Sequence, residues 1–437
     1  MSPAVPAVET TAVELLDRHI GWLLAWLDRN GWAGWDPYDL WDQPFGLWAM
    51  ARESLAQRVA GALLGRLEEL FPVAVRRVLH VQPRVNAKGM GLFAAALLDL
   101  ERIDGSEGQL RGSSAAAQCF DWLERNRVEV AGGVGWGYPF DWRSRVLIPR
   151  NTPTAVTTAF IGDAYWLRYV LREDAAALAC CEDICRFILG GLNRSPRTDD
   201  GAFCFSYTPV DHFQVHNANL LAAEFLVRLG TETGREEWIQ TGLDAGRFTL
   251  RELQPDGSLA YWSNAQQIGL DQDLFHSGFE IRALDAIART SGVTDFREAA
   301  DRYFQTWLKR YFADDGTPIF SHDRPGAVEV HSCAEALLCA CQLADRPGLA
   351  NGSLPRQLER TMRASVRYLW VPTGRGAGYF AWISQPRYGV RLQTSIPMIR
   401  MGQAWMLRGM SAARVTLQTG KNPLILPRRA REETSAR

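Results

Sequence analysis

Three histidines occupy corresponding places in successive repeats of the sequence. They are His216 in VHNANLL, His276 in LFHSGFE and His331 in VHSCAEA, and each lies at the start of a stretch that is apolar nearly all round. Such a stretch predicts a buried helix, and the N-terminus of a helix disfavours an added positive charge. Neutral histidines can accept or donate a proton near neutral pH. The three positions therefore predict acid–base chemistry at a site built from several helix starts.

Carboxylates accompany these histidines. Glu280 follows His276 by four residues and Glu335 follows His331 by four, which places each pair on one face of its helix. Either glutamate can orient its histidine or act itself as a buried carboxylate with a raised pKa. Asp273 precedes the second helix and either caps it or joins the site. The candidate catalytic residues are His216, Asp273, His276, Glu280, His331 and Glu335.

A loop rich in aromatic and charged residues, GWGYPFDWRSRVLIPR, supplies candidate binding groups. Flat aromatic faces beside guanidinium groups suit a sugar ring that bears a carboxylate or a phosphate. The alternative is a structural loop that packs on its own domain. Asparagines at one predicted helix start add amide groups. The candidate substrate-binding residues are Trp136, Tyr138, Asp141, Arg143, Arg150, Asn217 and Asn219.

These residues recur because the chain repeats one layout. A glycine turn, an aromatic extended piece, a polar loop and a helix return roughly every 60 residues, which is typical of an array of supersecondary units. The turn glycines are Gly135, Gly201, Gly257, Gly316 and Gly376. Helices that are apolar nearly all round alternate with amphipathic ones. This alternation predicts an all-α protein, an α/α toroid of six or seven helical hairpins with short β-hairpins on one face; an open solenoid is the alternative.

The ends of the predicted ring are less regular. Residues 13–31 have the amphipathic pattern of an outer helix, and residues 43–55, QPFGLWAMARESL, suggest the start of an inner one. Residues 88–100 and 113–127 suggest the next inner and outer pair. We expect one toroid domain over residues 1–415 and a charged, partly disordered tail over residues 416–437.

Composition narrows the possible partners. The 437-residue chain has a formal net charge of −1, and without a basic stripe a nucleic-acid partner is not expected. No apolar run approaches the roughly 18 residues of a membrane span, and the first residues lack the features of a signal peptide. The eight cysteines lie mostly in apolar helical patterns, which predicts reduced thiols in a cytoplasmic protein. No ligand spacing indicates a metal or a cofactor.

Several of these motifs resemble a family of bacterial proteins associated with polysaccharide biosynthesis. The similarity is carried by GWGYPFDWRSR, NTPTAVTTAF, FSYTPVDHFQVHNANLLAAEFL and LDQDLFHSGFEIRAL, and it extends from about Trp35 to Trp405. At the level of fold, the chain is also similar to six-hairpin glycosidases, polysaccharide lyases and N-acylglucosamine 2-epimerases. The resemblance implies a toroid and a link to glycans. In the epimerases, histidines on inner helices act as acid and base.

The sequence therefore predicts a carbohydrate-active enzyme acting on an acidic glycan or a sugar nucleotide. Epimerase or lyase chemistry would use His276 and His331, with Arg143 or Arg150 holding the acidic group. Hydrolysis would instead use a carboxylate pair, Asp273 with Glu280 or Glu335. Two alternatives belong to other classes: a terpenoid-type cyclase with an aromatic-lined cavity, and a glycan-binding or assembly protein without turnover.

Overall fold

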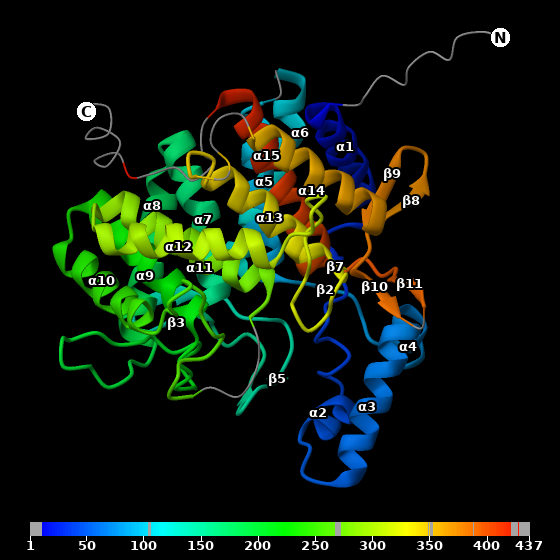
Figure 1. The fold of residues 1–437 in the computed structure, drawn as a ribbon, viewed down its shortest axis with the longest axis horizontal. Coiled ribbons are helices and arrows are strands. Elements are labelled where there is room, and N and C mark those ends of the chain that lie inside the picture. Colours follow the sequence, from blue (N-terminus) through cyan, green and yellow to red (C-terminus); the bar gives the residue numbers. More distant parts are fainter. Residues whose placement is uncertain are drawn as a thin grey trace.

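The protein forms a ring of helical hairpins, as a computed structural model shows (Figure 1). The structure describes residues 11–103, 106–266, 272–347, 349, 353–387, 389–420 and 427. Most of the predicted tail, residues 416–437, lies outside these ranges, and its first residues, 416–419, belong to the last helix. The predicted α/α toroid is confirmed, and the described residues contain six hairpins rather than seven.

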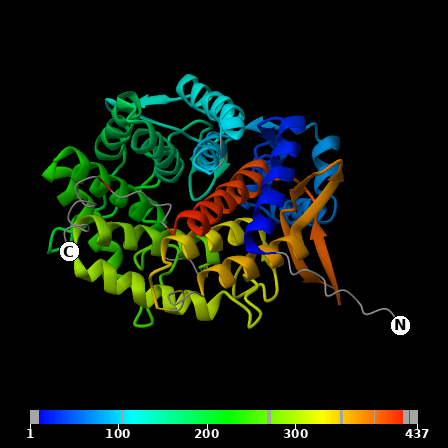
Figure 2. The same cartoon turned by 90° about the horizontal axis from the view of Figure 1, so that it is seen from above.

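Six helices form the inner layer of the ring, which Figure 2 shows from above. They are α5 (Ala87–Glu101), α7 (Ala155–Arg172), α9 (His216–Thr233), α11 (Leu274–Ser291), α13 (Val330–Gln342) and α15 (Trp405–Thr419). Each packs on the next, and α15 packs on both α13 and α5, so the ring is closed. All residues of α13 are buried, which agrees with its apolar pattern on every side.

Six outer helices cover the inner ones. They are α1 (Ala12–Asn30), α6 (Ser106–Arg125), α8 (Ala175–Gly191), α10 (Glu236–Arg251), α12 (Thr294–Arg310) and α14 (Leu354–Leu369). In α14, Leu358, Met362, Ser365 and Leu369 are buried at helical spacing, while arginines occupy the other face. The first helix, α1, pairs with the last one, α15, so segments from opposite ends of the chain form the sixth hairpin.

Short antiparallel strands lie in the loops that precede the inner helices. They are β1 (Ala33–Gly34), β2 (Arg84–Val85), β3 (Val128–Val130), β4 (Gly133–Gly135), β5 (Trp142–Arg143), β6 (Leu147–Ile148), β7 (Val328–Glu329), β8 (Trp370–Gly374), β9 (Ala377–Phe380), β10 (Ile383–Arg387) and β11 (Val390–Thr394). Strands β11, β10 and β7 form a three-stranded sheet, and the others pair in twos. Gly257 shows why the repeat needs its glycine: its φ is +84°, and a Cβ there would lie 2.7 Å from the backbone nitrogen of Tyr303.

One helix that the sequence predicts for the inner ring is not part of it. Residues 43–55 do not begin an inner helix; they contain α2 (Pro44–Met50), a short helix in an arm that projects from the ring (Figure 1). The arm continues through α3 (Leu55–Leu70) and α4 (Pro72–Val78) before α5 begins. Its aromatic and apolar residues resemble a buried helix in sequence, but only Gly46 and Ala49 of α2 are buried.

None of the described helices combines the length and the apolarity that crossing a bilayer requires. All eight cysteines are buried and free of disulfides.

Candidate functional site

A pocket of about 420 Å³ opens at the end of the ring where the inner helices begin. This volume lies in the range of small-molecule sites, roughly 300–1,000 Å³. The starts of α5, α7, α9, α11 and α13 and the turn before α15 all contribute to its wall. From these elements come Lys88, Val156, Asn217, Asp273, Phe275, His276, Phe279, His331, Arg400 and Met401. Residues far apart in the sequence therefore meet at one site.

His276 is held by the residue that caps its own helix. Asp273 is the N-cap of α11, and its Oδ1 accepts a hydrogen bond from the backbone N–H of His276 at 2.8 Å. The other carboxylate oxygen, Oδ2, lies 2.8 Å from His276 Nδ1. A carboxylate accepts hydrogen bonds, so Nδ1 carries the hydrogen and Nε2 is left as the basic nitrogen. Asp273 thus both caps the helix and orients the imidazole, which resolves the two roles that its sequence position allowed.

His331 has the opposite environment. It is buried, and neither ring nitrogen has a hydrogen-bond partner among the described residues. Its ring stacks on Phe275 with centroids 4.0 Å apart and lies 4.6 Å from the ring of Trp405. Burial lowers the pKa of His331 well below its usual value, and the positive charges of Lys88 and Arg400 lower it further. An unpaired buried polar group is costly, and His331 has two such nitrogens at the pocket wall.

Cations form another side of the pocket. Lys88 is buried, and its Nζ lies 4.4 Å from the centre of the Phe160 ring and 5.1 Å from that of Trp405. Burial, together with Arg400, lowers the pKa of Lys88. Arg400 makes two hydrogen bonds with Asp36, of 2.7 and 2.9 Å. Arg400 lies in η1 (Ile399–Ala404), a π-helical turn before α15, and such turns are frequent at functional sites.

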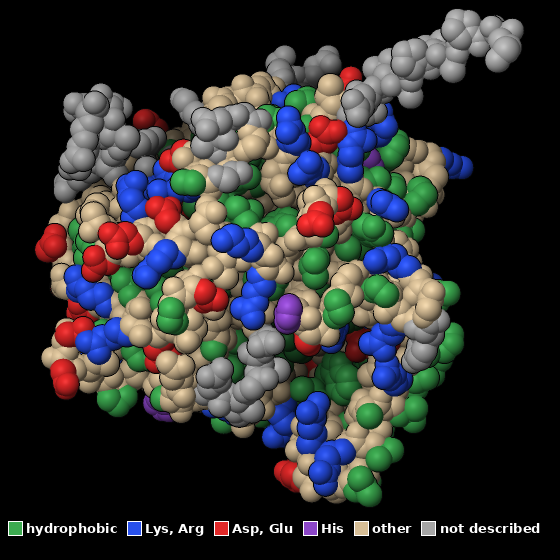
Figure 3. Space-filling model, in the orientation of Figure 1, with side chains coloured by type: hydrophobic (Ala, Val, Ile, Leu, Met, Phe, Trp, Pro, Cys, Tyr) green, Lys and Arg blue, Asp and Glu red, His purple; other side chains and the backbone are tan. Residues whose placement is uncertain are grey.

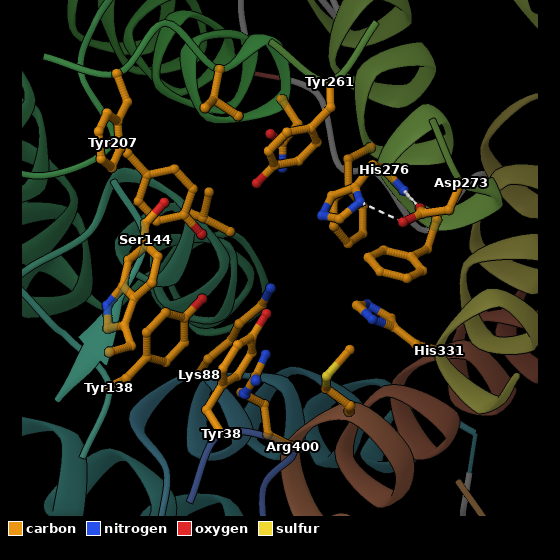
Figure 4. A pocket seen from close by; sticks show the side chains of 18 of the residues that line it. Tyr38, Lys88, Tyr138, Ser144, Tyr207, Tyr261, Asp273, His276, His331 and Arg400 are labelled. Carbon is orange, nitrogen blue, oxygen red and sulfur yellow. Dashed lines mark hydrogen bonds and ion pairs between the residues drawn. The ribbon is translucent and has the colours of Figure 1, made fainter. Parts of the chain in front are cut away.

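Tyr38, Tyr138 and Tyr207 lie across the cavity from the histidines, and Tyr261 packs beside His276 with ring centroids 4.8 Å apart (Figure 4). Tyr38, Tyr138, Tyr207 and Tyr261 all line the pocket. Burial raises the pKa of Tyr207 and Tyr261, so these hydroxyls remain neutral donors and acceptors at physiological pH. The remaining lining residues are Phe140, Trp142, Arg143, Ser144, Phe213, Val215, Trp262 and Gln272. Aromatic faces with hydroxyl, amide and cationic groups suit a polyhydroxylated ligand.

Two of the predicted carboxylates lie behind the pocket wall. Glu280 is buried and accepts hydrogen bonds from Tyr303 Oη at 2.8 Å and from Gln272 Nε2 at 2.6 Å. Burial raises the pKa of Glu280 well above its usual value. Glu335 is also buried and is paired with Arg282 at 2.6 Å. Neither lines the pocket, and Asp273 is the only carboxylate among the described residues that does.

The structure does not bring His216 into the pocket. Its Nε2 lies 3.0 Å from Glu252 Oε2 and its Nδ1 lies 3.2 Å from Thr249 Oγ1, so both nitrogens are engaged beside the outer helix α10. Asn219 also faces this helix and donates to the Ala245 carbonyl at 2.7 Å. Asn217, between them, does line the pocket, and its Oδ1 has no partner among the described residues. The three histidines therefore share a position in the repeat, but His216 contacts the outer helix whereas His276 and His331 line the pocket.

The predicted binding loop is divided in the same way. Trp136 is fully buried and donates its indole N–H to the Leu123 carbonyl at 2.9 Å, so it belongs to the core. Tyr138 and Arg143 line the pocket, and Arg143 Nε is buried without a partner among the described residues. Asp141 and Arg150 bind each other outside the pocket, with Asp141 Oδ1 accepting from the Arg150 backbone N–H at 2.6 Å.

Most of the residues that line the pocket were not proposed from sequence as site residues, among them Lys88, Tyr38 and Arg400. Lys88 stands at a predicted helix start, but one lysine near a helix N-terminus has no distinctive pattern. Tyr38 and Arg400 come from loops at opposite ends of the chain, and their approach depends on ring closure. Tyr38 lies in GWAGWDPYDLW, and the aromatic and acidic composition of that segment is the signal that indicates a possible site residue. Within the described ranges, no cluster of three or more histidine, cysteine or acidic side chains could hold a metal ion.

Comparison with known proteins shows what this fold is similar to. The sequence matches no protein-family model and no curated protein. Among solved structures, unsaturated glucuronyl hydrolase from Bacillus sp. GL1 aligns with a TM-score of 0.53 at 16% identity, over 76% of this chain and 86% of that one. Cellobiose 2-epimerase from Bacillus thermoamylovorans aligns with a TM-score of 0.54 at 12% identity, over 76% and 90%.

A third similar structure is a family 76 α-mannanase from Bacteroides thetaiotaomicron. It aligns with a TM-score of 0.55 at 12% identity, over 88% of this chain and 99% of that one. These alignments identify the fold as the six-hairpin, glycosidase-like α/α toroid that the sequence resembles. Identities this low transfer no catalytic residue.

Proposed function

We propose that this protein is a carbohydrate-active enzyme that removes a proton from a sugar carbon next to a carbonyl or carboxylate group. The observation that carries the proposal is the pair of histidines on one cavity. His276 is oriented by Asp273, and the buried His331 keeps both ring nitrogens unpaired among the described residues. The similarity of the fold to structures of sugar epimerases and a glucuronyl hydrolase supports a sugar substrate.

The two histidines receive different roles from their environments. His276, with Nδ1 held by Asp273, presents Nε2 as the general base, and the carboxylate stabilises the imidazolium that forms. His331, kept neutral by its lowered pKa, donates an N–H to the oxygen on which negative charge develops. A neutral imidazole suits this role because it has one N–H donor and adds no positive charge to a wall that already contains cations.

The charges that line the pocket favour an acidic sugar as the substrate. Lys88 and Arg143 line the pocket, and neither has an ion-pair partner among the described residues. The one lining carboxylate, Asp273, is already bound to His276. A carboxylate or phosphate on the substrate would pair with these cations. The resemblance to polysaccharide-biosynthesis proteins favours a uronate or a sugar nucleotide as this acidic sugar. The buried free thiols favour a reducing, cytoplasmic setting.

Hydrolysis by a carboxylate pair is less well supported. That mechanism needs two carboxyl groups facing the substrate, roughly 5–10 Å apart, and Glu280 and Glu335 are held behind the wall by Tyr303 and Arg282. A hydrocarbon substrate is also less well supported, because tyrosine hydroxyls, two amides and three cationic side chains line the same cavity. Proton abstraction is the step common to epimerisation, isomerisation and elimination.

The test is solvent exchange. The protein is incubated in D₂O with uronic acids, aldoses and nucleotide sugars, and NMR follows the exchange of carbon-bound hydrogen for deuterium. We expect deuterium at a carbon next to the carbonyl or carboxylate of an acidic sugar, and no exchange with the His276→Gln variant. Release of reducing ends without deuterium on carbon would refute proton abstraction and favour hydrolysis.

A further inference from the structure

The helix α3 of the projecting arm is apolar on its exposed face. Leu55, Val59, Leu63, Leu67 and Leu70 recur every three or four residues and are 38–72% exposed. The buried face of the same helix consists of Gln57, Leu64 and Glu68. This is the reverse of an ordinary surface helix, whose apolar stripe faces the core. We call the five exposed residues the arm stripe.

The apolar surface continues onto the neighbouring helices of the arm. On α2, the rings of Phe45 and Trp48 lie 5.6 Å apart and are about half exposed. At the other end, Phe71, Val78 and Leu79 are exposed around α4. Large contiguous apolar patches on a soluble protein mark an interaction surface. In Figure 3 the arm, at the lower right, carries hydrophobic side chains with basic ones beside them.

The arm is firmly held in place, so its exposed face is not the result of a loose helix. Arg76 of α4 is fully buried and pairs with Asp39 at 2.9 Å and with Glu68 at 2.7 Å. The guanidinium also donates to the carbonyl of Asp36 at 3.2 Å, and Asp36 binds the pocket residue Arg400. One buried cation thus fixes both the fold of the arm and its attachment beside the pocket.

The charges around the stripe select its partner. Over residues 44–80, all of which the structure describes, Arg52, Arg58, Arg66 and Arg77 are exposed, whereas Glu53 is the one exposed acid. Glu69 is half-buried and is paired with Arg66 and Arg387. A second copy of the chain would bring like charges together across the stripe. An anionic bilayer supplies both the apolar interior and the negative headgroups.

We propose that the arm docks on the surface of a membrane containing anionic phospholipids, with the arm stripe and the rings of Phe45 and Trp48 entering the interface. Leucine, phenylalanine and tryptophan on one side with arginines beside them form the pattern of a helix that lies in the membrane plane. The pocket loop at β5 packs against α2. Docking would therefore hold the pocket mouth close to the headgroups.

The experiment is flotation of the full-length protein with vesicles. Vesicles of phosphatidylcholine alone are compared with vesicles that contain about 30% phosphatidylglycerol, at low and high salt. The double variant Val59→Ser/Leu63→Ser removes the centre of the stripe, and Arg58→Gln/Arg77→Gln removes two of its cations. The matched controls are Val210→Ser, an exposed valine outside the arm, and Arg297→Gln/Arg356→Gln, two exposed arginines on α12 and α14.

We expect the wild-type protein to float with anionic vesicles and to remain unbound with neutral ones. Both arm variants should lose at least tenfold in bound fraction, while the controls bind as wild type. Equal flotation of the arm variants would overturn the proposal, as would no binding to either vesicle. Light scattering tests the competing occupant: a wild-type dimer that the stripe variant dissociates would show that the arm binds a second copy instead. Because the substituted residues are exposed, circular dichroism should show unchanged folding.

Discussion

The start of α9 and the start of α13 carry the same residue type in the same part of the repeat, yet their histidines have different environments. His216 is the first residue of its helix and finds Thr249 and Glu252 on the adjacent outer helix. His331 is the second residue of its helix, lines the pocket and has no partner among the described residues. One residue of offset turns a side chain by about 100° around the helix axis. The position of a residue in the repeat therefore predicts that it lies near the pocket end of the ring, but it does not predict the direction of its side chain.

The largest effect should come from the pocket histidines. Replacing His276 or His331 with glutamine removes the base or the N–H donor, so kcat should fall by about 10²–10⁴-fold. The measurement is the deuterium exchange rate with the best acidic sugar. His216→Gln is the matched control and should keep kcat within about twofold, because its ring lies outside the pocket. Activity within threefold of wild type in the His331 variant would contradict its role.

A smaller effect is expected from Asp273→Asn. Asparagine also caps helices well, so α11 should keep its stability, but the amide no longer stabilises an imidazolium on His276. The exchange rate should fall by roughly a hundredfold, the low end of the contribution of a positioned general base, with little change in melting temperature. A matched loss of activity and stability would show that Asp273 acts only as a cap.

Removing a pocket cation should change binding more than chemistry. Lys88→Met and Arg143→Gln each delete a charge that faces an acidic substrate, so KM should rise by about tenfold, equivalent to about 1.4 kcal/mol. Arg150→Gln is the control, since Arg150 is held outside the pocket by Asp141 and Asp42. If a neutral sugar is turned over equally well by all these proteins, the substrate is not acidic.

The other side of the comparison concerns stability. His216→Phe removes the hydrogen bonds of the ring with Thr249 and with the Glu252 carboxylate, which then keep only those from Asn219 and Asn264. The free energy of unfolding should therefore fall by about 1–3 kcal/mol. Denaturant unfolding measures this change. The corresponding replacement His331→Phe breaks no hydrogen bond described in the structure and should leave stability near wild type. If His331→Phe lowered the free energy of unfolding and His216→Phe did not, the two histidines would have the opposite roles.

The smallest expected effect depends on pH and on the cap of α13. Glu329 caps this helix by accepting from the Ser332 N–H at 2.8 Å, whereas Val215, the cap of α9, has no side-chain bond to give. Burial raises the pKa of Glu329 to about 8. In the unfolded chain it ionises near 4.5, so between these values the native state holds the extra proton and stability falls as pH rises. Glutamine does not ionise at this position. In the Glu329→Gln variant, the drop in melting temperature over this pH range should therefore be smaller by about 1–2 °C. An unchanged slope would assign it to other groups.

The fold could be predicted because its signal is repeated. Alternating buried and amphipathic helices indicated a ring, and the polar helix starts indicated where the pocket lies. His276 and Asp273 were found in this way because they lie within three residues of each other. His216 and Trp136 were assigned to the site because composition does not show orientation. Arg400 was not assigned, because its neighbours come from other repeats, and Lys88 was recognised only as a polar residue at a predicted helix start.

The arm was misjudged for a related reason. An apolar helical pattern ordinarily indicates burial, and QPFGLWAM has such a pattern, but burial depends on whether another element covers it. The exposed stripe on α3 shows that apolar periodicity reports an interface without naming the partner. The proposed membrane contact is one way to supply that partner outside the fold.

The pairing of α1 with α15 has a consequence for biosynthesis. Until residues 405–419 have left the ribosome, α5 and α13 lack the neighbour that joins them, so the nascent chain exposes apolar helix faces and the Arg400–Asp36 contact cannot form. The pocket is therefore among the last features to assemble, and chaperones would have to shield the unfinished ring. Because α1 and α15 are adjacent, a circular permutant that fuses them and opens a surface turn between another hairpin pair should still assemble the same cavity, with a different part of the chain completing it.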